Sequence, residues 1–299
     1  MNSLPSQETQ LPHIPVMVDE VLTYLSINPN GVYVDGTVGA GGHSKHILNQ
    51  LSPAGTLVGF DRDQEALDIA KKTLSASPSR IKLACASYHT FPTFLRNEGI
   101  PSVNGFLLDL GLSSMQLNDA SRGFAFSKSG PLDMRFDQTA ELDAESLINY
   151  SSEEELANII YEFGEERLSR RIARSIAQKR PISTVDDLYD AVRSATPPQH
   201  RNKSLARVFQ AFRIAVNQEL EKIESFLAHF MDSLTVGGRI VIMSYHSLED
   251  RMVKHSFKSL KQAGVLKVLT KKPIMASKEE IEINPRSRSA KLRAAERII

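Results

Sequence analysis

The sequence has few of the residues that mark secreted, zinc-stabilised or membrane-spanning proteins. Its single cysteine, Cys85, cannot form an internal disulfide and has no zinc-ligand spacing around it. Its longest apolar runs, such as residues 240–243, have the length of a strand and fall far below the roughly 18 residues of a membrane span. The first dozen residues have neither the basic start nor the apolar stretch of a signal peptide. We therefore expect a cytoplasmic protein with no membrane partner and no metal ion.

The low net charge of +1 hides a strong asymmetry along the chain. Residues 133–166 hold eleven acidic side chains and one basic one, whereas residues 167–213 hold eleven Lys or Arg and three Asp. Residues 251–299 hold thirteen Lys or Arg against four Glu. A basic segment of this kind would neutralise the phosphates of a nucleic acid. On charge alone, a solvated and partly disordered terminus explains it equally well.

Residues 31–109 alternate between strand-like and helix-like segments, the pattern of a parallel α/β sheet. Three of the strands end in a carboxylate: Asp35, Asp61 and Asp109. The predicted strands are 31–35, 56–61, 81–84 and 103–109, and the predicted helices between them are 43–51 and 64–74.

The pattern changes after residue 112. Strand signals almost disappear until residues 238–244, and the predicted helices before that strand are 152–163, 168–179, 185–195, 206–220 and 221–234. A further helix follows over about 248–261. The sequence therefore predicts a discontinuous α/β domain, residues 1–112 and 221–299, interrupted by an inserted helical domain over residues 113–220.

A glycine-rich turn, DGTVGAGGHS at residues 35–44, follows the first strand and begins a helix. Glycines let the backbone turn sharply and let a ligand approach closely, although the same turn could be purely structural. Asp61 ends the next strand, where a carboxylate accepts hydrogen bonds from ribose hydroxyls. NAD and S-adenosylmethionine both suit such a site. Read from Gly39, the dinucleotide fingerprint Gly-x-Gly-x-x-Gly/Ala needs glycine or alanine at position 44, where this sequence has Ser44. This departure favours S-adenosylmethionine, which has no pyrophosphate.

Two further polar groups follow strands whose ends should meet the same crevice. Asp109, Ser113 and Ser114 could accept hydrogen bonds from an amine, or could simply stabilise a turn. His246 follows the last strand and has the intrinsic pKa for proton transfer. A structural role is the alternative, since Ser247 could cap the next helix together with Asp250.

With these pieces in place, the sequence resembles the bacterial 16S ribosomal RNA cytidine-N4 methyltransferase family (RsmH, formerly MraW). The resemblance runs from about residue 13 to the C-terminus, with mild departures: Tyr245 stands where the family usually has Phe, and Phe163 where it usually has Tyr. The motifs are HIPV (13–16), DGTVGAGGHS (35–44), DRD (61–63), DLGLSSMQ (109–116), RGF (122–124), GPLDMR (130–135), FQAFRIAVNQEL (209–220), HSLEDR (246–251) and NPRSRSAKLR (284–293).

The resemblance implies an α/β, Rossmann-like class I S-adenosylmethionine-dependent methyltransferase domain with an inserted all-helical domain. It implies methylation of the exocyclic amine of a decoding-region cytidine in 16S rRNA, with the small ribosomal subunit as partner. A homodimer is left open, and an amino-methyltransferase acting on DNA or a small molecule is the alternative. The implied cofactor contacts are Gly41, Gly42, His43, Asp61, Tyr88, Asp109 and Gln116.

Cytosine N4 is a poor nucleophile, so the enzyme must hold it in line and accept a proton. We expect Asp109, helped by Ser113 or Ser114, to orient or accept from that amine. An extruded base could stack on Phe124, Phe126 or Tyr245, although each also suits an ordinary core. The expected substrate-binding residues are Phe124, Asp133, Arg135, Arg213, Tyr245, His246, Arg286, Arg288 and Arg293. The expected phosphate contacts are Arg207, Arg213, Arg286, Arg288 and Arg293.

Overall fold

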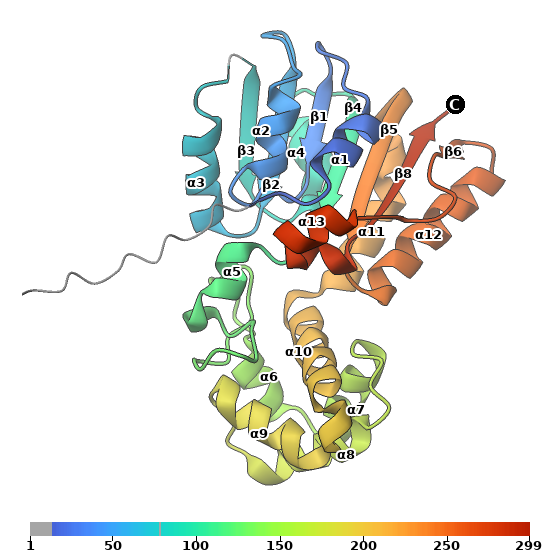
Figure 1. The fold of residues 1–299 in the computed structure, drawn as a ribbon. Helices are drawn as coiled ribbons and strands as arrows, with labels where there is room; N and C mark the ends of the chain where they lie inside the picture. Colours follow the sequence, from blue (N-terminus) through green and yellow to red (C-terminus); the bar gives the residue numbers. More distant parts are fainter. Residues whose placement is uncertain (1–13, 78) are drawn as a thin grey trace, which may run out of the picture.

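The computed structural model describes residues 14–77 and 79–299, so the first dozen residues and His13 lie outside the described part. Figure 1 shows a sheet covered by helices on both faces and, below it, a bundle of short helices. Within the described residues, no helix combines the length and the apolar character needed to cross a membrane. The strands are β1 (Val32–Asp35), β2 (Thr56–Asp61), β3 (Arg80–Cys85), β4 (Val103–Asp109), β5 (Leu234–Ser244), β6 (Leu266–Val268), β7 (Ile274–Met275) and β8 (Lys291–Arg297).

The sheet has the order β3-β2-β1-β4-β5-β8-β6, with β7 also paired to β8. Strands β1 to β5 are parallel, and β8 runs antiparallel to β5. The strand order reverses between β1 and β4, which is the topological switch point of a Rossmann-like sheet. The predicted α/β fold is therefore confirmed, and all five predicted strands exist. Strand β5 begins four residues before the predicted start at Gly238.

Side chains alternate between two cores on the two faces of the sheet, because successive residues of a strand point to opposite sides. Tyr33 of β1 packs with helices α1, α2 and α3, whereas its neighbour Val34 packs with α4, α11 and α12. Both faces are covered, so the central strands are almost continuously apolar. The covering helices are α1 (Val18–Leu25), α2 (Gly42–Leu48), α3 (Gln64–Leu74), α4 (Phe91–Asn97), α11 (Glu219–Ser233) and α12 (Ser247–Gln262).

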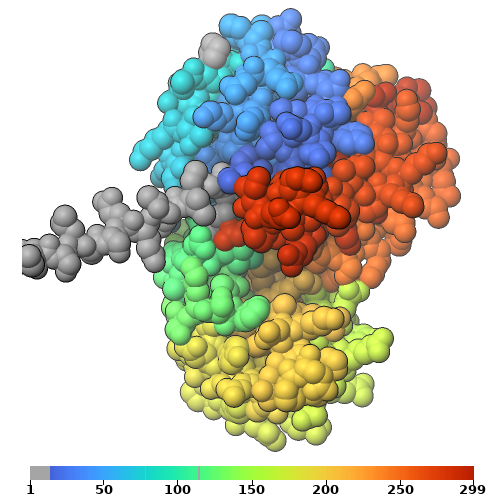
Figure 2. Space-filling view, in the orientation of Figure 1, coloured from blue at the N-terminus to red at the C-terminus, as the bar shows by residue number. Residues whose placement is uncertain are grey.

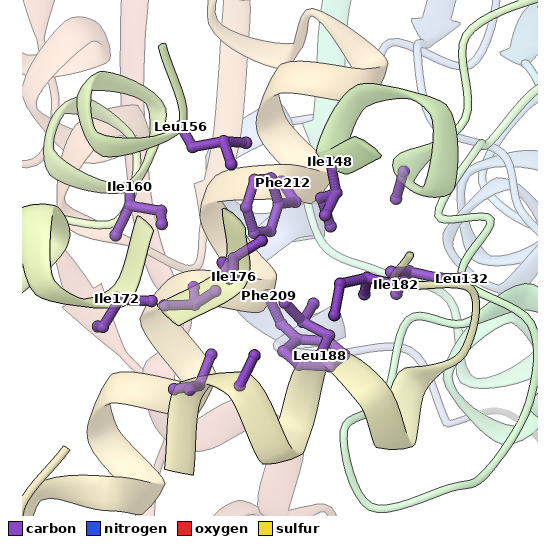
Figure 3. Packing of buried hydrophobic residues seen from close by; sticks show 14 of the residues in the cluster. Leu132, Ile148, Leu156, Ile160, Ile172, Ile176, Ile182, Leu188, Phe209 and Phe212 are labelled. Carbon is purple, nitrogen blue, oxygen red and sulfur yellow. The ribbon is translucent and has the colours of Figure 1, made fainter. Parts of the chain in front are cut away.

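The helical segment between β4 and α11 has a core of its own (Figure 3). Phe209 and Phe212 of α10 lie in that core with Ile176 and Leu188 from two other helices. Ser152 caps α7: its hydroxyl accepts from the Glu155 amide, and the Glu155 side chain accepts from the Ser152 amide. The helices are α5 (Ser114–Asn118), α6 (Ala144–Tyr150), α7 (Glu153–Glu162), α8 (Ser169–Lys179), α9 (Val185–Ala195) and α10 (Arg201–Asn217).

The chain leaves the helical segment at Gln218, which has a left-handed backbone conformation with φ 51°. The sequence predicted a helix over residues 206–220, but α10 ends at Asn217 and α11 begins at Glu219. Apolar periodicity alone does not reveal this break, because helix-favouring residues continue on both sides of it.

The basic C-terminal segment is folded into the sheet, so the alternative of a solvated, disordered terminus is wrong. Strand β8 lies between β5 and β6, and α13 (Lys278–Ile283) precedes it. Its inner residues Leu292, Ala294 and Ala295 are fully buried. Strand β8 is hard to predict from sequence because it has no β-branched or aromatic residue, the types that usually mark strands.

Arg293 shows how this strand is held. Its guanidinium is nearly buried and donates to both carboxylate oxygens of Asp250 on α12, at 2.6 and 3.2 Å. In place of the phosphate contact expected from the sequence, the structure gives Arg293 a buried ion pair between α12 and β8.

We predict that Arg293→Met lowers the free energy of unfolding by about 3 kcal/mol, because Asp250 keeps a largely buried charge without its partner. The matched control is Arg288→Met, which removes an exposed cation and should change stability by less than about 0.5 kcal/mol. Urea unfolding of both variants measures the difference. Equal stabilities would show that the pair does not hold β8 in place.

Candidate active site at the carboxyl edge of the sheet

A cleft of about 970 Å³, counted with its open mouth, lies at the carboxyl ends of the parallel strands. This is the crevice in which doubly wound sheets hold their ligands. Its walls come from the glycine-rich turn after β1, from the ends of β2 and β4, and from the first turns of α11 and α12. The lining residues include Gly36–Ala40, Gly42, His43, Asp61, Arg62, Tyr88, Asp109–Ser113, Gln116, Phe136, Glu219, Lys222 and Glu249.

Two glycines of the turn have left-handed backbone conformations but different surroundings. Gly39, with φ 53°, lines the cleft, and a Cβ built on it would meet no atom within 4 Å. Gly41, with φ 91°, would meet the Leu74 side chain of α3 at 3.3 Å. Gly41 was expected to contact the cofactor; the structure shows it packed against α3, while Gly42 and His43 line the cleft.

Asp61 faces the cleft with acceptor capacity to spare. One carboxylate oxygen accepts from the Gly39 amide at 2.7 Å and the other from the Asp63 amide at 2.9 Å. Each oxygen of a carboxylate has a second lone-pair site, so two remain for hydroxyl donors such as those of a ribose. Burial raises the pKa of Asp61 to about 6, against the effect of the two amide hydrogen bonds.

Asp35 lies deeper and has a structural role. It is 1% exposed, accepts from the Ser44 hydroxyl at 2.6 Å and accepts from the Thr37 amide at 3.1 Å. Burial is also the main cause that raises its pKa. Ser44, the residue that disfavoured a dinucleotide site, therefore holds the carboxylate at the start of the turn.

Asp109 has the one carboxylate oxygen, among the buried side chains described, that lacks any hydrogen-bond partner: Oδ1. Its other oxygen, Oδ2, lies 3.8 Å from Nδ1 of His43, and its backbone amide donates to the Thr37 hydroxyl at 2.7 Å. The Tyr245 ring packs on Gly111 beside it. Burial, then the Asp109 charge and a side-chain interaction with Asp109, raise the pKa of Tyr245 well above its usual value. The Tyr245 hydroxyl therefore lies close to the Asp109 carboxylate, although it makes no hydrogen bond of good geometry to Oδ1. An unpartnered buried acceptor in a ligand cleft fits a donor such as an amine.

Ser113 and Gln116 form the beginning of α5. The Ser113 hydroxyl accepts from the Gln116 amide and the Gln116 side chain accepts from the Ser113 amide, both at 3.1 Å. Both residues line the cleft, and the Ser113 hydroxyl keeps its proton available for donation. Ser114 is the first residue of α5, but its side chain lies outside the described part of the structure.

The wall opposite the glycine turn combines aromatic and cationic groups. Tyr88 packs edge-to-face on Phe226 at 5.8 Å. Arg62 lies 5.4 Å above the ring of Phe136 and donates to the Asn217 carbonyl. Phe136 and Lys222 were missed by the sequence analysis, because neither stands in a strand end or a glycine turn. Burial, followed by the Arg62 charge, lowers the pKa of Lys222 to about 8.

The other aromatic residues expected to stack on a base lie elsewhere. Phe124 is 6% exposed in the core of the helical segment and stacks on Phe136 at 5.5 Å. Phe126 packs against Phe209 in the same core. Of Phe124, Phe126 and Phe136, only Phe136, which was not expected there, lines the cleft.

Several expected substrate-binding side chains are engaged in internal ion pairs. Arg135 donates to both oxygens of Asp133 and to the Ala140 carbonyl. Arg213 donates to both oxygens of Glu219 at 2.8 Å. Of the four ion-paired residues, Glu219 is the one that lines the cleft.

His246 caps α12, so the expectation that Ser247 is the cap was wrong by one residue. Its Nδ1 accepts from the Glu249 amide, and its Nε2 lies 3.1 Å from the Glu249 carboxylate. Glu219, His246 and Glu249 bring ligand-type atoms within 4.8 Å of one another. Because the Arg213 guanidinium already binds Glu219, an added divalent cation would meet a fixed positive charge there.

The remaining tail arginines lie where the C-terminal segment meets the helical segment. Figure 2 shows residues of the C-terminal part beside those that follow β4 at the waist of the molecule. Arg286 donates to the Asn118 side chain at 3.4 Å, while its second terminal nitrogen is buried without a partner. Lys128 donates to the Asn118 carbonyl at 2.6 Å, and Arg288 is exposed.

Comparison with known proteins gives matches over nearly the whole chain. The sequence profile of the MraW methylase family matches residues 10–298. Proteins named ribosomal RNA small subunit methyltransferase H are similar to this chain in several bacteria. Those of Kosmotoga olearia and Geotalea uraniireducens are 48% and 45% identical, each covering 96% of this chain, with 97% and 98% of their own lengths matched. That of Trichormus variabilis is 47% identical and covers 99% of this chain and 95% of its own length.

Among solved structures, an rRNA methylase from Streptococcus thermophilus has 13% identity and a TM-score of 0.46, covering 94% of both chains. The sequence matches cover nearly the whole chain, including the glycine turn and the carboxylates at the strand ends. They show the family. The chain belongs to the MraW methylase family.

Proposed function

We propose that this protein uses S-adenosylmethionine to methylate the exocyclic N4 amine of a decoding-region cytidine in small-subunit ribosomal RNA. The names of its relatives support the coarser statement, a ribosomal RNA small-subunit methyltransferase. The amine as target is supported by the unpartnered Oδ1 of Asp109, which is a buried acceptor in the cleft.

The cleft suits S-adenosylmethionine, which supplies an electrophilic methyl group when bound. The empty space beside Gly39 admits a ligand close to the backbone, and the spare lone pairs of Asp61 accept the two ribose hydroxyls. Gln116, Tyr88, Gly42 and His43 line the same space. Ser44 occupies the position at which the dinucleotide fingerprint has its last glycine or alanine, in keeping with a cofactor that has no pyrophosphate.

Asp109 orients the target amine and accepts its proton. A donor placed on Oδ1 satisfies an acceptor that otherwise stays buried and unpaired. Ser113 lines the cleft nearby and can donate its hydroxyl proton to the base. Phe136, under the Arg62 guanidinium, offers the base an aromatic surface at the cleft wall.

The helical segment, residues 113–220, serves as the substrate-recognition domain, and the waist supplies phosphate contacts. Lys128 and Arg286 converge on Asn118, and the buried unpartnered nitrogen of Arg286 is suited to an anionic oxygen. Arg288 adds an exposed cation two residues later. RNA bound at this waist would present an extruded nucleotide to the cleft.

Transfer of labelled methyl groups to small ribosomal subunits lacking the modification, followed by nucleoside analysis, tests the proposal. We expect the label in N4-methylcytidine. Asp109→Asn should lower the turnover number at least about 100-fold, because the amide cannot accept the proton. Label in another nucleoside, or in DNA only, would overturn the proposed substrate. Near-normal turnover by Asp109→Asn would remove Asp109 from the proton path.

We predict that binding of the cofactor product S-adenosylhomocysteine weakens as the pH falls through the Asp61 pKa of about 6. The ribose hydroxyls need the ionised carboxylate, so the ionised fraction, and with it the affinity, should fall roughly fourfold from pH 7.5 to 5.5. Calorimetric titration measures this change. Asp61→Asn should bind more weakly and lose the pH dependence. A variant that keeps it would assign the dependence to another group.

We predict that Arg286→Gln reduces the slope of log affinity for small-subunit RNA against log salt concentration by about one, since one phosphate contact is lost. Affinity for S-adenosylhomocysteine should not change. Lys267→Gln, which removes an exposed cation on β6, is the matched control and should keep the slope. Asn118→Ala removes the hydrogen-bond partner of Arg286 and keeps its charge. An unchanged slope in Arg286→Gln would show that the residue only docks against Asn118.

A further inference from the structure

His43 is held in one tautomer by the segment that precedes α1. Its Nε2 lies 2.8 Å from the Val16 carbonyl oxygen, and the ring is 6% exposed. A carbonyl oxygen only accepts, so Nε2 carries a hydrogen and donates it. In the neutral ring Nδ1 is therefore an unprotonated acceptor.

That acceptor faces a carboxylate. Nδ1 lies 3.8 Å from Oδ2 of Asp109, and the exposed fractions of the two side chains are 7% and 18%. Two acceptors facing one another in a poorly solvated place repel unless a proton lies on one of them. A proton placed there converts the repulsion into an imidazolium–carboxylate pair or a hydrogen bond from a neutral acid.

Carboxylates lie around this pair. Asp35 at the end of β1 is buried and feels the charges of both His43 and Asp109. Tyr245, after β5, lies beside Asp109, and burial raises the pKa of its hydroxyl. The Asp35 charge also acts on Asp61 at the end of β2, and Glu280 of α13 acts on Tyr245. An imidazolium at His43 would thus face the carboxylates of Asp35 and Asp109.

We propose that His43 and Asp109 form a couple that holds, as one unit, the proton released by the methylated amine. This deepens the proposed function, on which it rests. In this proposal His43 takes part in proton transfer in addition to lining the cleft.

Once N4 carries the methyl group, it has a positive charge and one proton to lose. The N4–H bond breaks, its electron pair stays on nitrogen, and the proton binds Asp109 to give a neutral acid. Rotation of the carboxyl group about its terminal torsion brings this proton to His43. The O–H bond breaks, an Nδ1–H bond forms, and Asp109 is again a carboxylate, now beside an imidazolium.

Nitrogen-15 NMR of the cofactor-free protein tests the couple without any methyl transfer. His43 signals are assigned by their loss in His43→Gln. We expect the Nε2–H tautomer, with Nδ1 unprotonated in the neutral ring. In Asp109→Asn the Nδ1 resonance should move, because the carboxylate no longer faces that nitrogen. An Nδ1 resonance unchanged by Asp109→Asn, or an Nδ1–H tautomer in the wild type, would overturn the proposal even if the enzyme methylates ribosomal RNA normally.

The pH dependence of methyl transfer supplies the second test. The couple accepts a proton only when it holds none, so the wild-type rate should fall as the pH drops through the titration of the couple. His43→Gln leaves Asp109 alone and should shift this acidic limb to lower pH and reduce the plateau rate about tenfold or more. His46→Gln, an exposed histidine on the same helix, is the matched control and should match the wild type. A His43→Gln profile that coincides with the wild-type profile would contradict the proton-holding role.

Discussion

The buried carboxylate of Asp63 joins the two parts of this molecule. It accepts from the Arg122 guanidinium at 3.0 Å and from the Gln116 side chain at 3.3 Å, while its own position caps α3 two residues after Asp61. Arg122 also donates to the carbonyls of Arg135 and Phe136. The Arg122–Asp63 ion pair therefore fixes the start of the helical segment against the end of β2 and the start of α3.

The exit of the helical segment is held by a second buried group, Asn217. Its side chain accepts from the Phe136 amide and donates to the Met134 carbonyl, and its own carbonyl accepts from Arg62 and Lys222. The entering and leaving chains are thus cross-linked at the cleft wall. This arrangement explains why Phe136 and Lys222 reach the site although no sequence motif marks them. Both are hydrogen-bonded to Asn217, which lies 81 positions after Phe136.

The parallel sheet and the cleft at its edge could be predicted from the sequence. A short apolar run followed by a carboxylate or a glycine turn is a local pattern, and it can be recognised without knowing the rest of the fold. Asp35, Asp61 and Asp109 were placed correctly for that reason. The arginines were harder to place, because a charged side chain shows no preference for solvent or for a buried partner until the fold brings Asp250 to Arg293 or Glu219 to Arg213. Strand β8 was missed for a related reason, since alanines become strand residues only when helices cover both of their faces.

The position of β8 between β5 and β6 separates the order of the sheet from the order of synthesis. Residues 266–268 pair with β8 and with no other described strand, so they wait for residues 291–297 before they can join. As the chain emerges from a ribosome, β5 and β6 must therefore leave room for a strand that has yet to be made. An enzyme proposed to modify the small ribosomal subunit would complete its own sheet only late in its translation.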